Sequence, residues 1–85
     1  MAVIEGPDYE TSRQRLANDP VVIEMAEEMK ADPNLNKVLA TLTHDDGKPN
    51  FKFIQAANRE YERRGGRGAD FIGDIATVIL RLING

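Results

Sequence analysis

A cluster of arginines and glycines is the part of this sequence in which binding chemistry is easiest to propose. The stretch reads EYERRGGRGADF over residues 60–71. The stretch contains Arg63, Arg64 and Arg67, and Arg59 lies just before it. Cations at one helix end could contact phosphates, and Tyr61 could stack on a base. The motif occurs once, without the repetition of an RGG tract, so these arginines are candidate nucleic-acid contacts and a solvated helix terminus is the simpler interpretation.

Residues suited to nucleophilic catalysis or metal binding are scarce. The chain has no cysteine, one serine, Ser12, and one histidine, His44, and nothing in the sequence places these two together. His44, Asp45 and Asp46 are possible metal ligands. Adjacent residues on a short turn cannot all point at one ion, and no second ligand cluster exists. We therefore expect no metal site.

Three acidic residues and two methionines share one segment. Glu24, Glu27 and Glu28 could supply paired carboxylates, yet on an exposed helix face such residues are usually solubilising charge. Met25 and Met29 are expected to fill the core rather than to form a peptide-binding surface. The sequence therefore predicts no catalytic residue, no cofactor and no enzyme activity.

Length and composition predict one small domain. The chain has 85 residues, 41% of them hydrophobic and 29% charged. At this size a single core is only marginally sufficient, so association with a partner could add stability. We expect a flexible N-terminal arm over residues 1–6 and a single helical domain over 7–85. The longest apolar stretch is too short to cross a bilayer, which predicts a cytoplasmic protein without membrane contacts.

The formal net charge of −3 is unevenly distributed. Residues 1–30 contain seven acids and three bases, whereas residues 51–85 contain four acids and six bases. Such asymmetry can orient a partner or a neighbouring subunit.

Two Asp-Pro pairs predict helix starts in the first half of the chain. Asp19-Pro20 and Asp32-Pro33 each combine a capping aspartate with a proline. Proline lacks a backbone N–H, but the first helical position does not need that donor. Apolar residues follow each pair at helical spacing; they are Val21, Val22, Met25, Ala26 and Met29, and then Leu35, Val38, Leu39 and Leu42. A short helix over residues 8–18 could precede them.

The middle of the chain has two interpretations. Phe53, Ala57 and Tyr61 form a helical stripe that ends at Gly65-Gly66, where glycine suits a left-handed helix cap. The alternative is a β-hairpin around residues 41–54, since TLTH and FKFI alternate on either side of a polar turn. The helix accounts for more residues, and the hairpin is the second choice.

Residues 70–84 predict a helix that is buried on several sides. The polar residues fall on one narrow stripe; they are Asp70, Asp74, Thr77, Arg81 and Asn84. The apolar residues cover roughly 200° of the circumference, wider than a surface helix needs. Such a helix either runs through the middle of the bundle or is shared with another chain. The candidate partner-interface residues are Phe71, Ile72, Ile75, Ile79, Leu82 and Ile83.

The segments NDPVV and ADPNL, within residues 18–42, resemble the Asp-Pro-started helices of STI1-type co-chaperone domains. Those domains are small helical modules that hold apolar peptide segments in a groove. The resemblance implies that a helical string of this kind can bind peptides. It does not extend to the glycine-rich break or to the C-terminal helix.

Together these features predict an all-α bundle of four to five short helices with a central C-terminal helix. The expected function is a non-catalytic protein-interaction or assembly module, such as a self-associating small subunit or a stoichiometric inhibitor. Its partner would be another protein or a second copy of the chain. The alternative is a nucleic-acid-binding accessory protein that uses the basic cluster at residues 59–67.

Overall fold

The computed structural model describes residues 9–69 and 71–85 and is all-helical over that range. The helices are α1 (Tyr9–Ala17), α2 (Pro20–Lys30), α3 (Leu35–Leu42), α4 (Phe51–Arg63) and α5 (Asp74–Asn84). The predicted all-α bundle is confirmed. The predicted arm over residues 1–6 lies outside the described residues.

The two Asp-Pro pairs behave differently in the structure. Asp19 caps α2 as predicted, because its Oδ1 accepts the N–H of Val21 at 2.9 Å. The predicted helix start at Asp32-Pro33 is wrong, since α3 begins at Leu35. Asp32 Oδ1 accepts the N–H of Asn34 at 2.8 Å, and the Leu35 N–H donates to the Asp32 carbonyl. These bonds form a turn that uses the carboxylate before a helix can use it as a cap.

The β-hairpin alternative around residues 41–54 is wrong. Its pairing is limited to one isolated bridge between Thr43 and Pro49, closed by a turn in which Gly47 has φ +84°. The residues on either side are helical, and Asn50 caps α4 by accepting the N–H of Phe53 at 3.0 Å. The helical stripe therefore decided the conformation of this segment.

Helix α4 ends in the left-handed glycine cap that the sequence predicted. Gly65 has φ +89°, its N–H donates to the Glu62 carbonyl, and the Gly66 N–H donates to the Tyr61 carbonyl. This pair of bonds is a Schellman motif, which satisfies carbonyls at the helix end. A side chain at Gly66 would collide with the Tyr61 ring, because an added Cβ would overlap the ring carbons.

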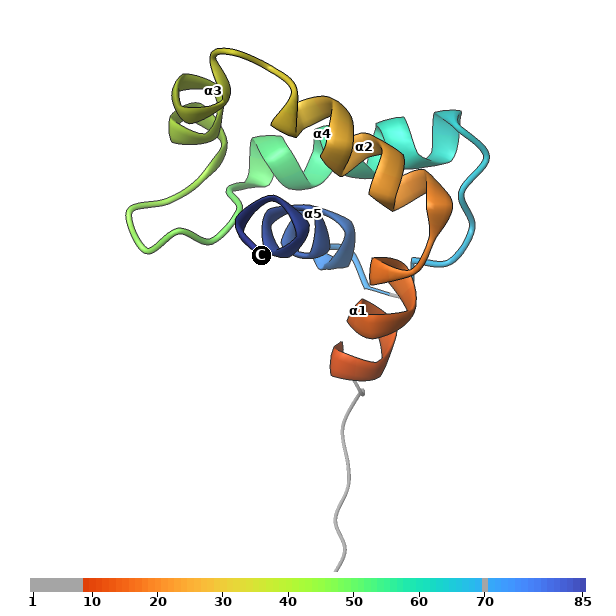
Figure 1. Ribbon diagram of the computed structural model, residues 1–85. Helices are drawn as coiled ribbons and strands as arrows, with labels where there is room; N and C mark the ends of the chain where they lie inside the picture. The colour runs from red at the N-terminus through yellow and green to blue at the C-terminus, as the bar shows by residue number, and fades with distance from the viewer. Residues whose placement is uncertain (1–8, 70) are drawn as a thin grey trace, which may run out of the picture.

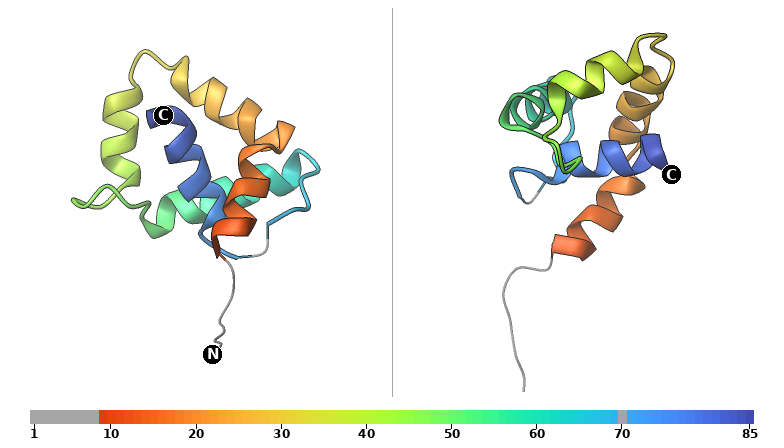
Figure 2. Two further views of the ribbon diagram at one scale, coloured as in Figure 1. Left: turned by 60° about the horizontal axis from the view of Figure 1, so that its bottom comes forward. Right: turned by 90° about the vertical axis from the view of Figure 1, so that its left-hand side faces the viewer.

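Helix α5 runs through the middle of the bundle, in contact with α1, α2 and α4 (Figure 1). Its buried residues include Ile75, Ala76, Val78, Ile79 and Leu80, which join the core contributed by the other helices. The two further views show α3 beside α4 at the edge of the molecule (Figure 2). No residue of α3 is fully buried. The prediction of a central C-terminal helix is confirmed.

The start of α5 differs from the prediction. The helix begins at Asp74 rather than at residue 70, and Gly73, a poor helix former, occupies the N-cap position. Phe71 and Ile72 therefore precede the helix. Asn58 on α4 holds this entry segment by donating its Nδ2–H to the Ile72 carbonyl at 2.8 Å. Asp70 is not among the described residues.

Helix α1 covers the polar stripe of α5. Ser12 donates its hydroxyl to Asp74 at 2.8 Å, and the Arg13 Nε–H donates to the same carboxylate at 3.2 Å. Farther along, Arg81 forms a bidentate pair with Glu10 at 2.9 and 3.1 Å. The polar stripe thus faces a helix of the same chain, which explains how α5 is buried on several sides. None of the helices in the described part of the chain is long and apolar enough to cross a membrane.

Candidate functional site

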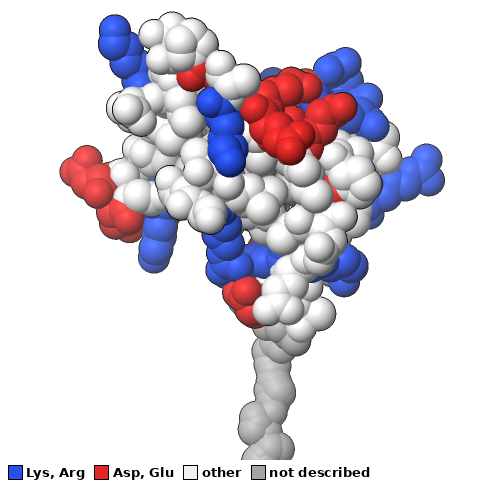
Figure 3. Space-filling view, viewed as in Figure 1, with Lys and Arg blue, Asp and Glu red and all other residues white. Residues whose placement is uncertain are grey.

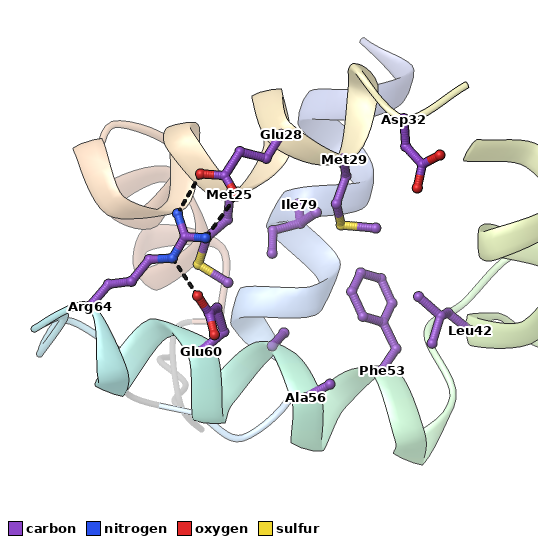
Figure 4. A pocket seen from close by; sticks show the side chains of 11 residues that line it. Met25, Glu28, Met29, Asp32, Leu42, Phe53, Ala56, Glu60, Arg64 and Ile79 are labelled. Carbon is purple, nitrogen blue, oxygen red and sulfur yellow. Dashed lines mark hydrogen bonds and ion pairs between the residues drawn. The ribbon is translucent and has the colours of Figure 1, made fainter. Parts of the chain in front are cut away.

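An apolar groove opens between α2 and α4, with α5 beneath it and α3 at one end (Figure 4). Its volume is about 370 Å³. Its apolar lining comes from four helices; the residues are Met25, Met29, Leu42, Phe53, Ala56, Ala57 and Ile79. Phe53, Ala57 and Ile79 belong to the core, whereas Ala56 is exposed. The groove is therefore a place where the core meets the surface.

Arg64, the C-cap residue of α4, ties one end of the groove together (Figure 4). Its guanidinium bonds to Glu60 of α4 at 2.6 Å and to two residues of α2, Glu24 at 2.7 Å and Glu28 at 2.8 and 2.9 Å. We call these four residues the Arg64 clasp. The Arg64 side chain is only 18% exposed. Its ion pairs connect α4 to α2, and its Nε, Nη1 and Nη2 atoms all donate hydrogen bonds to these carboxylates.

The ion pairs of the clasp change the pKa of Glu60, Glu28 and Arg64. Hydrogen bonds from Arg63 and Arg64 lower the pKa of Glu60 from 4.5 to about 2. A hydrogen bond from Arg64 also lowers the pKa of Glu28. The carboxylates in turn raise the pKa of Arg64. Opposite charges within hydrogen-bonding distance favour each other's charged form. Glu28, Glu60 and Arg64 are therefore ionised at neutral pH.

The far end of the groove carries a further acid, Asp32. Within the described residues it makes no ion pair, and its Oδ1 is held by the Asn34 N–H. Acidic side chains also gather over α2 on the face shown in Figure 3. Among the described residues that line the groove, Arg64 is the one basic residue. The edge of the groove on the α2 side is therefore acidic.

The four candidate nucleic-acid contacts are not equivalent. Arg64 is held in the clasp, and Arg63 donates its Nε–H to Glu60 at 3.0 Å. Arg59 and Arg67 are exposed. Within the described residues they form no ion pair. Two of the four guanidinium groups thus already face carboxylates of the same chain.

The glycines that follow these arginines have structural roles. The Tyr61 hydroxyl donates to Asp19 at 2.6 Å and accepts the N–H of Gly68 at 2.7 Å, while Gly66 lies against the Tyr61 ring. Burial, followed by the hydrogen bond to Asp19, raises the pKa of Tyr61. Tyr61 is a core residue, 1% exposed. Its ring is therefore not available to stack on a base.

The candidate interface residues on the C-terminal segment are divided between core and surface. Ile75 and Ile79 are buried, and Leu82 and Ile83 are partly buried against the same core. Phe71 is half-buried and packs on Tyr9 with ring centroids 4.5 Å apart. Ile72 is 71% exposed. The structure thus leaves Ile72 as the most accessible member of this set.

The residues considered for catalysis are not brought together. Ser12 is buried and donates to Asp74, whereas His44 lies in the exposed turn before α4. No cluster of three or more His, Cys, Asp or Glu that could hold a metal exists within residues 9–69 and 71–85.

A second hollow, of about 680 Å³, lies between α1, α5 and the turn before α4. It contains Arg13, Lys48 and Arg81. Both arginines are already paired, Arg13 with Asp74 and Arg81 with Glu10. These cations are thus partly neutralised, and this hollow is a weaker candidate than the groove.

Sequence reasoning missed the groove and the clasp. Met25 and Met29 do pack with the core as expected, but they also line the groove. The repeated pairing of acids on α2 with Arg64 could not be found from local spacing, because Glu24 lies 40 residues from Arg64 and Glu28 lies 36 residues away. The charge asymmetry between the two halves of the chain was the one available indication.

Comparison with known proteins gives one informative match. The chain is 43% identical over 79 residues to the "Gene 80 protein" of Mycobacterium phage L5, an alignment that covers 93% of this chain and 84% of the relative. No family model matches the sequence. No solved structure matches it either. On the strength of that identity and coverage, the chain belongs to the same protein family as the Gene 80 protein of Mycobacterium phage L5.

Proposed function

We propose that this chain is a non-catalytic protein-interaction or assembly module. The observation that supports the proposal is the groove between α2 and α4, which is apolar along its lining and acidic along one edge. Recognition grooves of this kind bind through apolar contacts and take their specificity from a few polar groups. The relative encoded by a bacteriophage fits a partner from the phage or from its host cell.

Affinity capture from mycobacterial extracts tests the proposal. The name of the related phage suggests mycobacteria as the host. A matched pair of variants isolates the groove. Ala56→Gln places a polar side chain on the groove lining, and Ala40→Gln makes the same change at an exposed position of α3 outside the groove. Both substitutions keep a good helix former.

The wild-type chain and Ala40→Gln should retain the same protein in stoichiometric amounts, and Ala56→Gln should lose it. If the partner is a second copy, light scattering should instead show a multiple of the 9.5 kDa chain mass that Ala56→Gln reduces. The proposal would be contradicted if Ala56→Gln changed neither the amount of captured protein nor the mass measured by light scattering.

Nucleic acid in place of protein would favour the alternative function. In that case the captured material should be removed by nuclease and by high salt, because phosphate contacts weaken steeply with salt. Arg59→Ala with Arg67→Ala should then abolish capture, since these are the two exposed arginines of the cluster.

A further inference from the structure

We infer that the groove binds an amphipathic helix of a partner protein, with an apolar face flanked by lysine or arginine side chains. The inference rests on the proposed function, because it names the occupant of the same groove. It follows from the shape of the groove, from the side chains that line it and from the charge around it.

The shape of the groove suits a helix. Two helices, α2 and α4, form its walls, and core residues such as Phe53 and Ile79 form its floor. An occupant helix presents apolar residues at positions i, i+3, i+4 and i+7 to a groove of this kind. The small side chains of Ala56 and Ala57 let such a helix approach α4 closely. The volume of about 370 Å³ would hold roughly a dozen water molecules, which an apolar face would release.

The lining can adapt to its occupant. Met25 and Met29 project from α2 into the groove (Figure 4). Methionine side chains are unbranched and flexible, so they can repack around different apolar side chains. Leu42 of α3 closes the groove at the end away from the clasp, and α3 itself has no fully buried residue.

The charge around the groove selects a basic occupant. Three of the residues that line the groove carry carboxylates, Glu28, Asp32 and Glu60, and a fourth acid, Glu24, bonds to Arg64 beside them. The cations bonded to these acids are Arg63 and Arg64. The acids therefore outnumber the bases. A lysine or arginine on the occupant would meet this excess negative charge, whereas an acidic occupant would be repelled.

Binding of a designed peptide tests the inference directly. The probe is a helix of about 18 residues, or about five turns. It carries leucines on one face, lysines on both flanks and a single tryptophan. Because the chain itself has no tryptophan, the fluorescence reports the peptide alone. A second peptide has glutamate in place of every lysine. We expect the basic peptide to bind at least about tenfold more tightly than the acidic one. Equal affinities, or no binding of either peptide, would overturn the inference.

Two matched pairs of variants locate the contact. Ala56→Gln should weaken basic-peptide binding about tenfold or more, since it buries an unpaired amide, and Ala40→Gln should not. Asp32→Asn removes a charge but keeps the oxygen that accepts the Asn34 N–H. It should weaken binding roughly two- to fivefold, the range of an exposed ion pair. Asp46→Asn is its control, because Asp46 holds the Lys48 N–H in a similar turn away from the groove.

Methyl NMR of the methionines gives an independent reading of the site. The Met25 and Met29 methyl signals should shift as the basic peptide is added, because both side chains line the groove. Binding that leaves both signals unmoved would place the peptide elsewhere and refute the inference.

The outcomes separate this inference from the proposed function. A captured protein that depends on Ala56, combined with no preference between the two peptides, would sustain the proposed function and reject the basic helix. A dimer that Ala56→Gln dissociates would show that the occupant is a second copy, which also rejects the inference. Capture and mass that are both insensitive to Ala56→Gln would reject the proposed function.

Discussion

Tyr61 links three parts of the chain through one hydroxyl. It donates to Asp19, the cap of α2, and accepts the N–H of Gly68 in the loop that leads to α5. Its ring also packs against Gly66. The glycines of the arginine- and glycine-rich stretch therefore have structural roles: Gly65 forms the cap of α4, and Gly66 and Gly68 lie against Tyr61.

Replacing Tyr61 by phenylalanine should lower the free energy of unfolding by about 1–3 kcal/mol, because Asp19 and the Gly68 N–H lose a buried partner. Urea unfolding followed by circular dichroism measures the change. Tyr9→Phe is the control, since Tyr9 is 47% exposed and its ring packing on Phe71 is preserved. An equal effect of the two substitutions would show that the Tyr61 hydroxyl contributes nothing to stability.

Glu60 should make stability depend on pH in acid. Its pKa in the folded chain is about 2, below the ordinary value of 4.5. A lowered folded-state pKa contributes stability that is fully present above pH 4.5 and is lost as the pH falls towards about 2. Glu60→Gln should therefore unfold at lower urea than the wild type above pH 5, and the difference should disappear near pH 2.

The control for this titration is Glu27→Gln, which removes an exposed carboxylate of α2 outside the clasp. It should shift the urea midpoint little, because the Glu27 side chain is exposed. A Glu60→Gln difference that stays constant from pH 7 to about 2 would mean that ionisation of Glu60 does not stabilise the clasp.

At the scale of elements, α1 docks on α5 through a buried polar contact. Asp74 is 1% exposed, at the start of α5, and it accepts hydrogen bonds from Ser12 and Arg13 of α1. A buried carboxylate is tolerated only where hydrogen bonds and an opposite charge compensate it. This contact fixes which face of α1 meets the polar stripe of α5.

Ser12→Ala should cost about 1.5–3 kcal/mol, the range of a hydrogen bond to a charged group. A double-mutant cycle with Asp74→Asn checks whether the two residues act together. We expect a coupling energy above about 0.5 kcal/mol, measured by urea unfolding of the four proteins. Additive effects would show that the Ser12 hydroxyl does not stabilise the chain through Asp74.

At the scale of the whole molecule, α5 completes the core within a single chain. It contacts α1, α2 and α4, so its wide apolar face needs no second chain to cover it. The groove forms where α2 and α4 diverge above α5, and α3 lies at its end. The lining of the groove thus comes from several helices, of which α5 contributes Ile79.

Aspartate substitutions at two isoleucines should distinguish the core from the surface. Ile79→Asp should unfold the chain, because a buried unpaired charge costs several kcal/mol and a chain of this size has only about 4–13 kcal/mol of stability. Ile72→Asp should change stability by less than about 0.5 kcal/mol, since Ile72 is 71% exposed. Circular dichroism and thermal unfolding measure both.

A folded Ile79→Asp protein with unchanged stability would contradict the central position of α5. The pair also guides interaction studies. Loss of partner binding in Ile79→Asp would report unfolding, whereas loss in Ile72→Asp would report a surface contact.

The sequence by itself determined the helical class, the stripe of α4, the Asp19 cap and the Gly65 cap. Each depends on residues a few positions apart, so local spacing and capping chemistry are enough to predict it. The same reasoning placed the starts of α3 and α5 too early. The Asp32 carboxylate forms a local turn with the Asn34 N–H instead of capping α3. Before Asp74, Gly73 occupies the N-cap position and Asn58 holds the non-helical segment through a hydrogen bond to the Ile72 carbonyl.

Only the tertiary structure decided the groove, the Arg64 clasp and the burial of Asp74. Arg64 meets Glu24 across 40 residues, and Ser12 meets Asp74 across 62. Contacts of this range depend on how the helices pack, and many packings are compatible with the same local pattern of apolar residues. Packing also placed α5 in the middle of the bundle, because α1 covers its polar stripe and α2 and α4 pack against it.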